Sequence, residues 1–172
     1  MFAPEKTPHE RRQALRASLA SETITKLPGA FNPLTARLIE DIGGFEGVYV
    51  SGAVLANDLG LPDIGLTTLT EVAHRGGQIA RATNLPVLID ADTGFGEPMS
   101  AARTVAEFEA AGLAALHLED QVNPKRCGHL DGKEVVPRDL MVRRITAAVR
   151  ERHDDAFVIC ARTDAALSLI HI

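Results

Sequence analysis

A single cysteine stands among cations in the second half of the chain. Cys127 directly follows Lys125 and Arg126, and Gly128 and His129 come directly after it. Nearby positive charge favours the thiolate form of a cysteine, so a thiol in this setting can serve as a proton donor or a nucleophile. A lone cysteine can equally be a small apolar residue of the core. These residues leave both interpretations of Cys127 open, and the rest of the sequence has to decide between them.

Two carboxylates stand two residues apart at the end of an apolar run. Asp90 and Asp92 close the run over residues 87–92, and a glycine-rich turn follows at 93–96. Side chains two apart on a strand share a face, so both carboxylates are expected to point the same way. Such a pair suits Mg²⁺, which takes few protein carboxylates and keeps positions for water and substrate oxygens; Mn²⁺ is the alternative ion. Aspartates also favour turns, so a purely structural role for the pair stays open.

Polar side chains also share a face at the ends of other short apolar runs. The sets are Tyr49 with Ser51, His117 with Glu119, and Cys160 with Arg162 and Asp164. Glu119 can hold a metal-bound water without touching the metal, or it can pair with Arg162. The planar guanidinium of Arg162 suits a substrate carboxylate, although a salt bridge with Asp164 or Glu119 would use it equally well. His117 is expected to be an inward-facing histidine with a hydrogen bond, and Cys160 to be a packing residue.

The segment after the second apolar run could bind an anion. Ser51, Gly52 and Ala53 supply a hydroxyl and consecutive backbone N–H groups, which can hold an anionic oxygen. The chain as a whole carries a net charge of −5. An anionic substrate would therefore need local cations at its site, and Lys125 and Arg126 could supply them.

Composition excludes several classes of protein. The negative net charge argues against a nucleic-acid surface. With 45% hydrophobic and 24% charged residues, the chain of 172 residues has the composition of a globular protein with a sizeable core. Its two cysteines lie in unlike contexts and do not indicate a disulfide framework. Because there is no apolar leader and no run of about 18 apolar residues, we expect a cytoplasmic protein without a membrane span.

Short apolar runs alternate with helical stretches along the chain. The predicted strands lie at 24–30, 47–51, 86–91, 114–118 and 156–161. The predicted helices lie at 8–21, 33–42, 68–83, 100–111 and 138–152, with Ser100 as the cap of the fourth. This alternation indicates an α/β fold with a parallel sheet, either doubly wound or a (β/α)8 barrel of the TIM type. The barrel is favoured, because the polar residues cluster at the C-terminal ends of successive strands and no G-x-G-x-x-G fingerprint follows the first strand.

Six segments of the chain occur together in one enzyme superfamily. They are residues 49–52 (YVSG), 59–63 (LGLPD), 90–96 (DADTGFG), 117–121 (HLEDQ), 125–129 (KRCGH) and 161–165 (ARTDA). Through them the chain resembles the isocitrate lyase/phosphoenolpyruvate mutase superfamily, and its closest likeness there is to the methylisocitrate lyases. The mutases lack the Cys-Gly-His loop. Classical isocitrate lyases usually carry tryptophan where this chain has Ala53, and they lack its Leu-Pro-Asp segment.

The resemblance implies a Mg²⁺-dependent retro-aldol (Claisen-type) cleavage of a tricarboxylate. The implied substrate is 2-methylisocitrate, which gives pyruvate and succinate in propionate catabolism; isocitrate is the alternative. Asp90 and Asp92 would bind the metal, with Glu119 acting through water. Cys127 would protonate the succinate enolate, and Tyr49 would be the base or a hydroxyl partner.

The same resemblance implies the groups around the substrate. Arg162 and His129 would stabilise the charge of the enolate. Residues 51–53 would grip the carboxylate of the pyruvate part, with Gly128 near it. The loop that carries Cys127 would close as a lid and exclude water. Supporting residues would be Asp63, Lys125 and Arg126.

The length of the chain limits what this barrel can contain. A complete barrel needs about 250 residues and eight strands, of which this chain is expected to hold about five. We therefore interpret residues 1–172 as the N-terminal portion of one barrel domain, and residues 168–172 as a non-native or truncated end that departs from the family pattern. A catalytically inactive fragment is the alternative to an active lyase. The resemblance implies a homotetrameric parent protein with no nucleic-acid or membrane partner.

Overall fold

The computed structural model describes residues 4–128 and 132–165. In these residues four parallel strands form one sheet in the order β1-β2-β3-β4, which is also their order along the chain. The strands are β1 (Val48–Val50), β2 (Val87–Asp90), β3 (Ala115–Glu119) and β4 (Val158–Arg162). Parallel strands that stay neighbours in chain order form the wall of a barrel, whereas a doubly wound sheet reverses its order.

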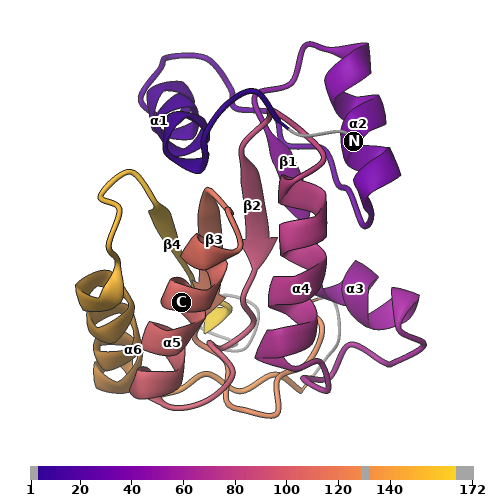
Figure 1. Cartoon of the computed structure of the whole chain (residues 1–172). Helices are drawn as coiled ribbons and strands as arrows, with labels where there is room; N and C mark the ends of the chain where they lie inside the picture. Colours follow the sequence, from indigo (N-terminus) through magenta and orange to yellow (C-terminus); the bar gives the residue numbers. More distant parts are fainter. Residues whose placement is uncertain (1–3, 129–131, 166–172) are drawn as a thin grey trace.

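Helices cover one face of the sheet and its N-terminal end. They are α1 (Pro8–Leu19), α2 (Pro33–Ile42), α3 (Gly52–Asp58), α4 (Leu69–Ala80), α5 (Pro98–Ala110) and α6 (Arg138–Glu151). Figure 1 shows α4 and α5 on the near side of the strands, α6 beside α5, and α1 beyond the ends where the strands begin. Within the residues described, no helix is long and apolar enough to cross a membrane.

The main core lies between the sheet and these covering helices. Alternate residues of the strands point toward the helices, as the twofold period of a strand requires. The buried residues of this core come from the strands (Val48, Val50, Ile89, Leu116 and Leu118) and from the surrounding segments (Ile79, Val105, Phe108 and Phe157). The remaining strand residues therefore face the opposite side, which is the inner face of the barrel wall.

The inner face is apolar where the strands begin and polar where they end. Leu88, Ala115 and Val158 pack with Leu15 of α1 near the strand starts. The polar residues of this face lie two to four positions further along β2, β3 and β4, at Asp90, His117, Glu119 and Arg162, and Tyr49 of β1 joins them. The sheet thus separates a structural end from an end that carries chemistry.

Arginines of α1 hold the structural end together. Arg12 donates from Nε to the carbonyl of Leu113 at 2.9 Å, and Arg16 donates from Nε to the carbonyl of Ala156 at 3.0 Å. Arg11 is only 3% exposed and binds backbone carbonyls at the end of α4 and just beyond it. Charged donors make the stronger hydrogen bonds, so α1 is fixed across the loops that lead into the strands.

The strand predicted at 24–30 is wrong. Gly29 makes an isolated parallel bridge to Tyr49, in which the Tyr49 N–H donates to the carbonyl of Pro28 at 2.9 Å. Pro28 has no N–H with which to continue that ladder toward Gly47. The described residues therefore contain four of the about five strands expected.

Two further expectations about single residues were wrong, and one helix was not expected. α5 begins at Pro98 with Glu97 at the N-cap, not at Ser100, because proline suits the first turn of a helix. Cys160 is exposed instead of packed, since it lies on the inner face of β4, the outermost strand of the described sheet. The short helix α3 was not predicted; Ser51 caps it with its hydroxyl.

Candidate active site

The strand ends bring the predicted polar residues onto one face. The strand register pairs Asp90 with His117 across β2 and β3, and Glu119 with Arg162 across β3 and β4. Tyr49 lies on the same face of β1, and its hydroxyl is 2.8 Å from Nε2 of His117. Parallel strands end at a common edge, so five side chains from four strands meet at one end of the sheet.

Asp90 and Asp92 converge on the backbone of Gly52 at the start of α3. Asp90 Oδ2 accepts from the Gly52 N–H at 3.3 Å, and Asp90 Oδ1 accepts from the Asp92 N–H at 2.9 Å. A Cβ at position 52 would lie 2.9 Å from Asp90 Oδ2 and 3.2 Å from Asp92 Oδ1, so a side chain there would collide with the pair. Asp92 has a φ of +46°, a left-handed conformation that aspartate tolerates better than most residues. The two buried carboxylates therefore face one point.

Lys125 brings a positive charge from the cysteine loop to these carboxylates. Its Nζ forms ion pairs with Asp63 and, at 2.7 Å, with Oδ1 of Asp92. Burial and then the charge of Asp90 raise the pKa of Asp92 to about 6, although Lys125 lowers it. Burial lowers the pKa of Lys125, but the Asp92 and Asp63 carboxylates outweigh it and raise that pKa above its ordinary value. Lys125 therefore stays charged and fastens the loop to the carboxylate pair.

The donor atoms fit a magnesium ion better than a closed metal site. Among the residues that the structure describes, no group of three or more histidine, cysteine, aspartate or glutamate side chains could hold a metal. Asp90 and Asp92 supply two converging carboxylates, and Oε1 of Glu119 is buried without a hydrogen-bond partner. Mg²⁺ takes about one or two carboxylates and keeps several waters, which a buried carboxylate such as Glu119 can hold.

Tyr49 and His117 form a neutral pair beside Asp90. Their rings stack with centroids 5.7 Å apart, and Nδ1 of His117 lies 3.6 Å from Oδ1 of Asp90. Burial lowers the pKa of His117, against the opposing effect of Asp90. Burial and then the charge of Asp90 raise the pKa of Tyr49. Tyr49 thus keeps its proton at neutral pH, which favours the role of hydroxyl partner over that of base. His117 is buried and hydrogen-bonded, as its inward position predicted.

Glu119 and Arg162 form the next part of the site. Nη1 of Arg162 lies 3.5 Å from Oε2 of Glu119, and Nη2 donates to Oδ1 of Asp164 at 2.9 Å. Burial and then the charge of Asp90 raise the pKa of Glu119 to about 8, although Arg162 lowers it. The arginine therefore makes the ion pairs that the sequence allowed, while about a third of its side chain stays exposed on the inner face, at 35%.

The predicted anion-binding segment has partners of its own. The Gly52 N–H donates to Asp90, and Oγ of Ser51 accepts from the Val54 N–H at 3.5 Å. The backbone N–H of Ala53 lies in the first turn of α3, where amide donors have no partner within a helix. A substrate carboxylate at this position would use the Ala53 N–H and displace the long Ser51 bond, whereas the Gly52 donor serves the carboxylate pair.

The cysteine loop lies against Arg162. A Cβ at position 128 would be 2.5 Å from Nη2 of Arg162, so a larger residue there would have to displace the end of the arginine side chain. Cys127 is half-buried beside it. His129, which was predicted to act with Arg162, lies outside the described residues, as does the segment 168–172. The structure thus brings Cys127, Gly128 and Arg162 together at the end of β4.

Sequence reasoning missed Gln121, whose side chain joins the cysteine loop to the end of β4. Its side chain is 1% exposed and hydrogen-bonds the backbone of Arg126 and the carboxylate of Asp164. The signal available in the sequence was its place at the end of the segment HLEDQ, two positions after Glu119.

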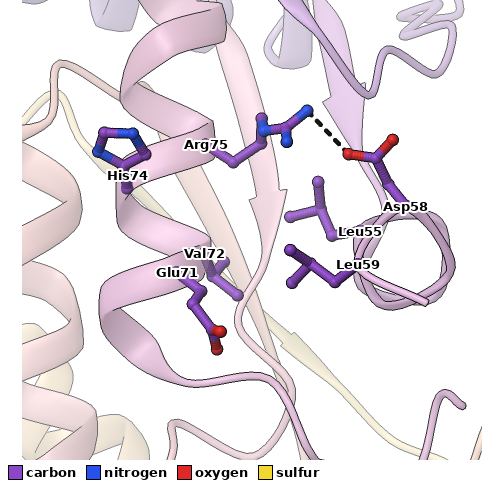
Figure 2. A pocket seen from close by; sticks show the side chains of 7 residues that line it. All are labelled: Leu55, Asp58, Leu59, Glu71, Val72, His74 and Arg75. Carbon is purple, nitrogen blue, oxygen red and sulfur yellow. Dashed lines mark ion pairs between the residues drawn. The ribbon is translucent and has the colours of Figure 1, made fainter. Parts of the chain in front are cut away.

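A separate small pocket lies between α3 and α4. Figure 2 shows Leu55 of α3 and Leu59, the residue after that helix, facing Val72 of α4, with Arg75 reaching toward Asp58. The Arg75–Asp58 ion pair measures 2.9 Å and is partly exposed. None of the residues predicted to do chemistry lines this pocket, so it is a gap between two helices and not part of the candidate active site.

Comparison with known proteins identifies a family that matches most of the chain. The family model described as phosphoenolpyruvate phosphomutase matches residues 15–170. The chain is 74% identical over 166 residues to "Probable 2-methylisocitrate lyase 2" of Corynebacterium glutamicum. The aligned residues make up 96% of this chain and 54% of that protein. The chain therefore spans about half the length of the curated relatives it matches.

Solved structures match over nearly the whole chain. Phosphoenolpyruvate phosphomutase from Streptomyces platensis subsp. rosaceus superimposes with a TM-score of 0.88 at 35% identity, covering 92% of this chain and 55% of that one. 2,3-Dimethylmalate lyase, a member of the PEP mutase/isocitrate lyase superfamily, superimposes with a TM-score of 0.86 at 37% identity, covering 98% of this chain and 56% of that one. The predicted fold class, an α/β chain that forms part of a TIM-type barrel, is confirmed. The chain belongs to the phosphoenolpyruvate mutase family, within the PEP mutase/isocitrate lyase superfamily.

Proposed function

We propose that this protein is a carbon–carbon lyase that cleaves 2-methylisocitrate into pyruvate and succinate, a step of the methylcitrate cycle. One observation carries the proposal: Lys125, two residues before Cys127, pairs with Asp92 of the carboxylate pair at 2.7 Å. This contact supports the proposal that the predicted acid and the predicted metal ligands belong to one site. The identity of 74% to a C. glutamicum relative named for this reaction supports the substrate.

Charge at the site suits a tricarboxylate. Arg162 faces the inner side with part of its side chain exposed, and a planar guanidinium can hold a carboxylate in two hydrogen bonds. The N–H of Ala53 at the start of α3 can receive the carboxylate of the part that becomes pyruvate. Lys125 and Arg126 add positive charge from the loop to a chain whose net charge is −5.

Asp90 and Asp92 would hold Mg²⁺, and Glu119 would orient its water. When bound, the ion supplies Lewis-acid stabilisation of the oxygens of the developing keto acid. Tyr49 keeps its proton, because burial and Asp90 raise its pKa. With Nε2 of His117 donating to the hydroxyl oxygen, that proton would be donated to a substrate oxygen. These residues orient the hydroxyl and carboxylate next to the bond that breaks.

The thiol of Cys127 would complete the reaction. Loss of the hydroxyl proton to a base lets the carbonyl of pyruvate form, and the electrons of the broken C–C bond pass to the succinate part as an enolate. The thiol of Cys127 then gives its proton to the carbon of the succinate part at which the C–C bond broke. Arg162, beside Gly128 of the loop, stabilises the enolate charge until the proton arrives. Contact between the loop and Arg162 also excludes water from this intermediate.

Pyruvate release by the product of the complete open reading frame tests the proposal. We expect release from 2-methylisocitrate that needs Mg²⁺ and stops when EDTA is added. The ratio of kcat/KM for 2-methylisocitrate and isocitrate identifies the substrate, since one methyl group is worth about 1–3 kcal/mol in a pocket. A higher kcat/KM for isocitrate would replace the proposed substrate, and release from neither would refute the lyase.

A further inference from the structure

The cysteine loop leaves the sheet at the end of β3 and returns beside its own starting point. Gln121 and Val135 form an antiparallel bridge, and the Val122 N–H donates to the carbonyl of Glu134 at 2.8 Å. This pairing fixes the base of the loop. The pairing does not reach Cys127, which lies further along the loop.

The side chain of Gln121 extends that pairing into the loop. Its Oε1 accepts from the Arg126 N–H at 2.9 Å, and its Nε2 donates to the Arg126 carbonyl at 2.9 Å. One amide group thus satisfies both backbone groups of a single residue, as a neighbouring strand would. The residue held in this way directly precedes Cys127.

The same amide also contacts the end of β4. Nε2 of Gln121 donates to Oδ2 of Asp164 at 2.9 Å, and Oδ1 of Asp164 accepts from Arg162 at 2.9 Å. Both amide hydrogens therefore have acceptors, and the oxygen has a donor. A flipped amide would set its oxygen against two other acceptors, so the hydrogen bonds define the orientation of the group.

Burial makes this arrangement specific to glutamine. Gln121 is 1% exposed and Asp164 is 1% exposed, so water cannot replace a lost partner without opening the structure. A charged side chain of the same length would lack a donor for Asp164, and an apolar one would leave the backbone of Arg126 unsatisfied. Beside this arrangement, the backbone of Gly128 comes close enough to Arg162 that a Cβ at position 128 would meet Nη2 of the arginine at 2.5 Å.

We propose that Gln121 is a positioning residue that clamps the segment 126–128 onto Arg162 and thereby sets the place of the Cys127 thiol. The clamp is read directly from the hydrogen bonds, and its catalytic meaning rests on the proposed function. A glutamine that merely fills the core would leave the accessibility of Cys127 unchanged when it is replaced by a side chain of equal size.

The rate at which iodoacetamide alkylates Cys127 tests the clamp without reference to lyase activity. Trypsin separates the two cysteines, because Cys127 falls in the peptide 127–133 and Cys160 in the peptide 153–162. In Gln121→Met and Gln121→Glu we expect alkylation of Cys127 to rise about tenfold or more, since each lost hydrogen bond shifts an equilibrium by roughly two- to tenfold. Cys160 should react as in the wild type and serves as the internal reference.

Gln13→Met is the matched control, because Gln13 lies exposed on α1 and its replacement should change neither rate. Wild-type rates at Cys127 in both folded Gln121 variants would overturn the clamp. If neither variant folds by circular dichroism, amide exchange in the wild type decides: the Arg126 N–H should exchange at least about tenfold slower than an unprotected amide. Exchange at the unprotected rate would overturn the clamp as well.

The steady-state constants separate the clamp from the proposed function. If the protein releases pyruvate, Gln121→Glu should lower kcat by about tenfold or more and change KM less. The reason is that the substitution displaces the Cys127 thiol and not the substrate pocket. Faster alkylation in a protein that releases no pyruvate would support the clamp and refute the lyase. Wild-type alkylation rates in Gln121 variants of a protein that releases pyruvate would refute the clamp and support the lyase.

Discussion

Nζ of Lys125 lies 2.7 Å from Oδ1 of Asp92, so a cation of the cysteine loop contacts a carboxylate of the predicted metal pair. The same ammonium group pairs with Asp63, which follows α3. Three segments far apart in the sequence therefore meet at one buried charge. The loop that carries Cys127 is tied to the site at Lys125 and again, through Gln121, at Arg126.

Removal of the Lys125 charge should destabilise the fold. Lys125→Met keeps a long stem but leaves the buried Asp92 and the partly buried Asp63 without their shared cation. Breaking a buried ion pair by removing one partner costs about 3–5 kcal/mol, and we expect a loss of this size in the free energy of unfolding measured with urea. Lys6→Met, an exposed lysine, is the control. A loss below about 0.5 kcal/mol, as at ordinary surface positions, would show that the pairing contributes nothing.

Magnesium should stabilise the protein through the carboxylate pair. A ligand that binds only the folded state at about one hundred times its Kd adds about 2.7 kcal/mol, which raises the melting temperature. We expect this rise in the wild type and in Asp41→Asn, where an exposed carboxylate is lost. Asp92→Asn should abolish it, because an amide is a weaker ligand for a hard cation. An equal rise in Asp92→Asn would exclude that carboxylate from the metal site.

Glu119 should make stability fall as the pH rises. Burial raises its pKa to about 8 from an ordinary 4.5, so the folded state holds a proton that the unfolded state has released. The stabilisation is complete below about pH 4.5, declines above it and is lost as the pH passes 8. Asp92, with a pKa raised to about 6, adds to the decline between 3.8 and 6. Urea unfolding at pH 5, 6.5 and 8 without metal measures the slope.

Glu119→Gln should flatten that slope between pH 6.5 and 8, since an amide does not titrate. Asp154 has its pKa lowered to about 2 and acts in the opposite direction only at lower pH, so it does not disturb this window. A slope in Glu119→Gln that equals the wild-type slope would mean that another group carries the dependence.

Much of the fold was predictable from the local pattern of the sequence. Helix α2 covers the range 33–42 that was expected, because Pro33 opens it and two glycines follow it. The strands β2 and β3 and their polar ends follow from apolar runs that stop at acidic residues. The strand predicted at 24–30 does not form, because Pro28 within the run has no N–H to continue a ladder beyond the single bridge at Gly29.

Contacts between distant segments were not predictable from such patterns. Spacing places Asp90 and Asp92 on one strand end, but nothing local indicates that Lys125 reaches Asp92 or that Gly52 donates to Asp90. The clamp of Gln121 on Arg126 depends equally on how the loop folds back. The residue types of the site were evident in the sequence, whereas their partners required the three-dimensional structure.

The central claim is that Cys127 protonates the succinate enolate within this site. Cleavage of 2-methylisocitrate in D₂O with Mg²⁺ tests it most directly, with pyruvate release as the rate and the deuterium content of succinate as the product readout. We predict one deuterium per succinate in the wild type. Turnover should be lower by about 10²–10⁴-fold in Cys127→Ser, the loss typical of a missing general acid. Cys160→Ser is the control and should keep the wild-type rate. Near-normal turnover by Cys127→Ser, with deuterium incorporated as before, would contradict the account.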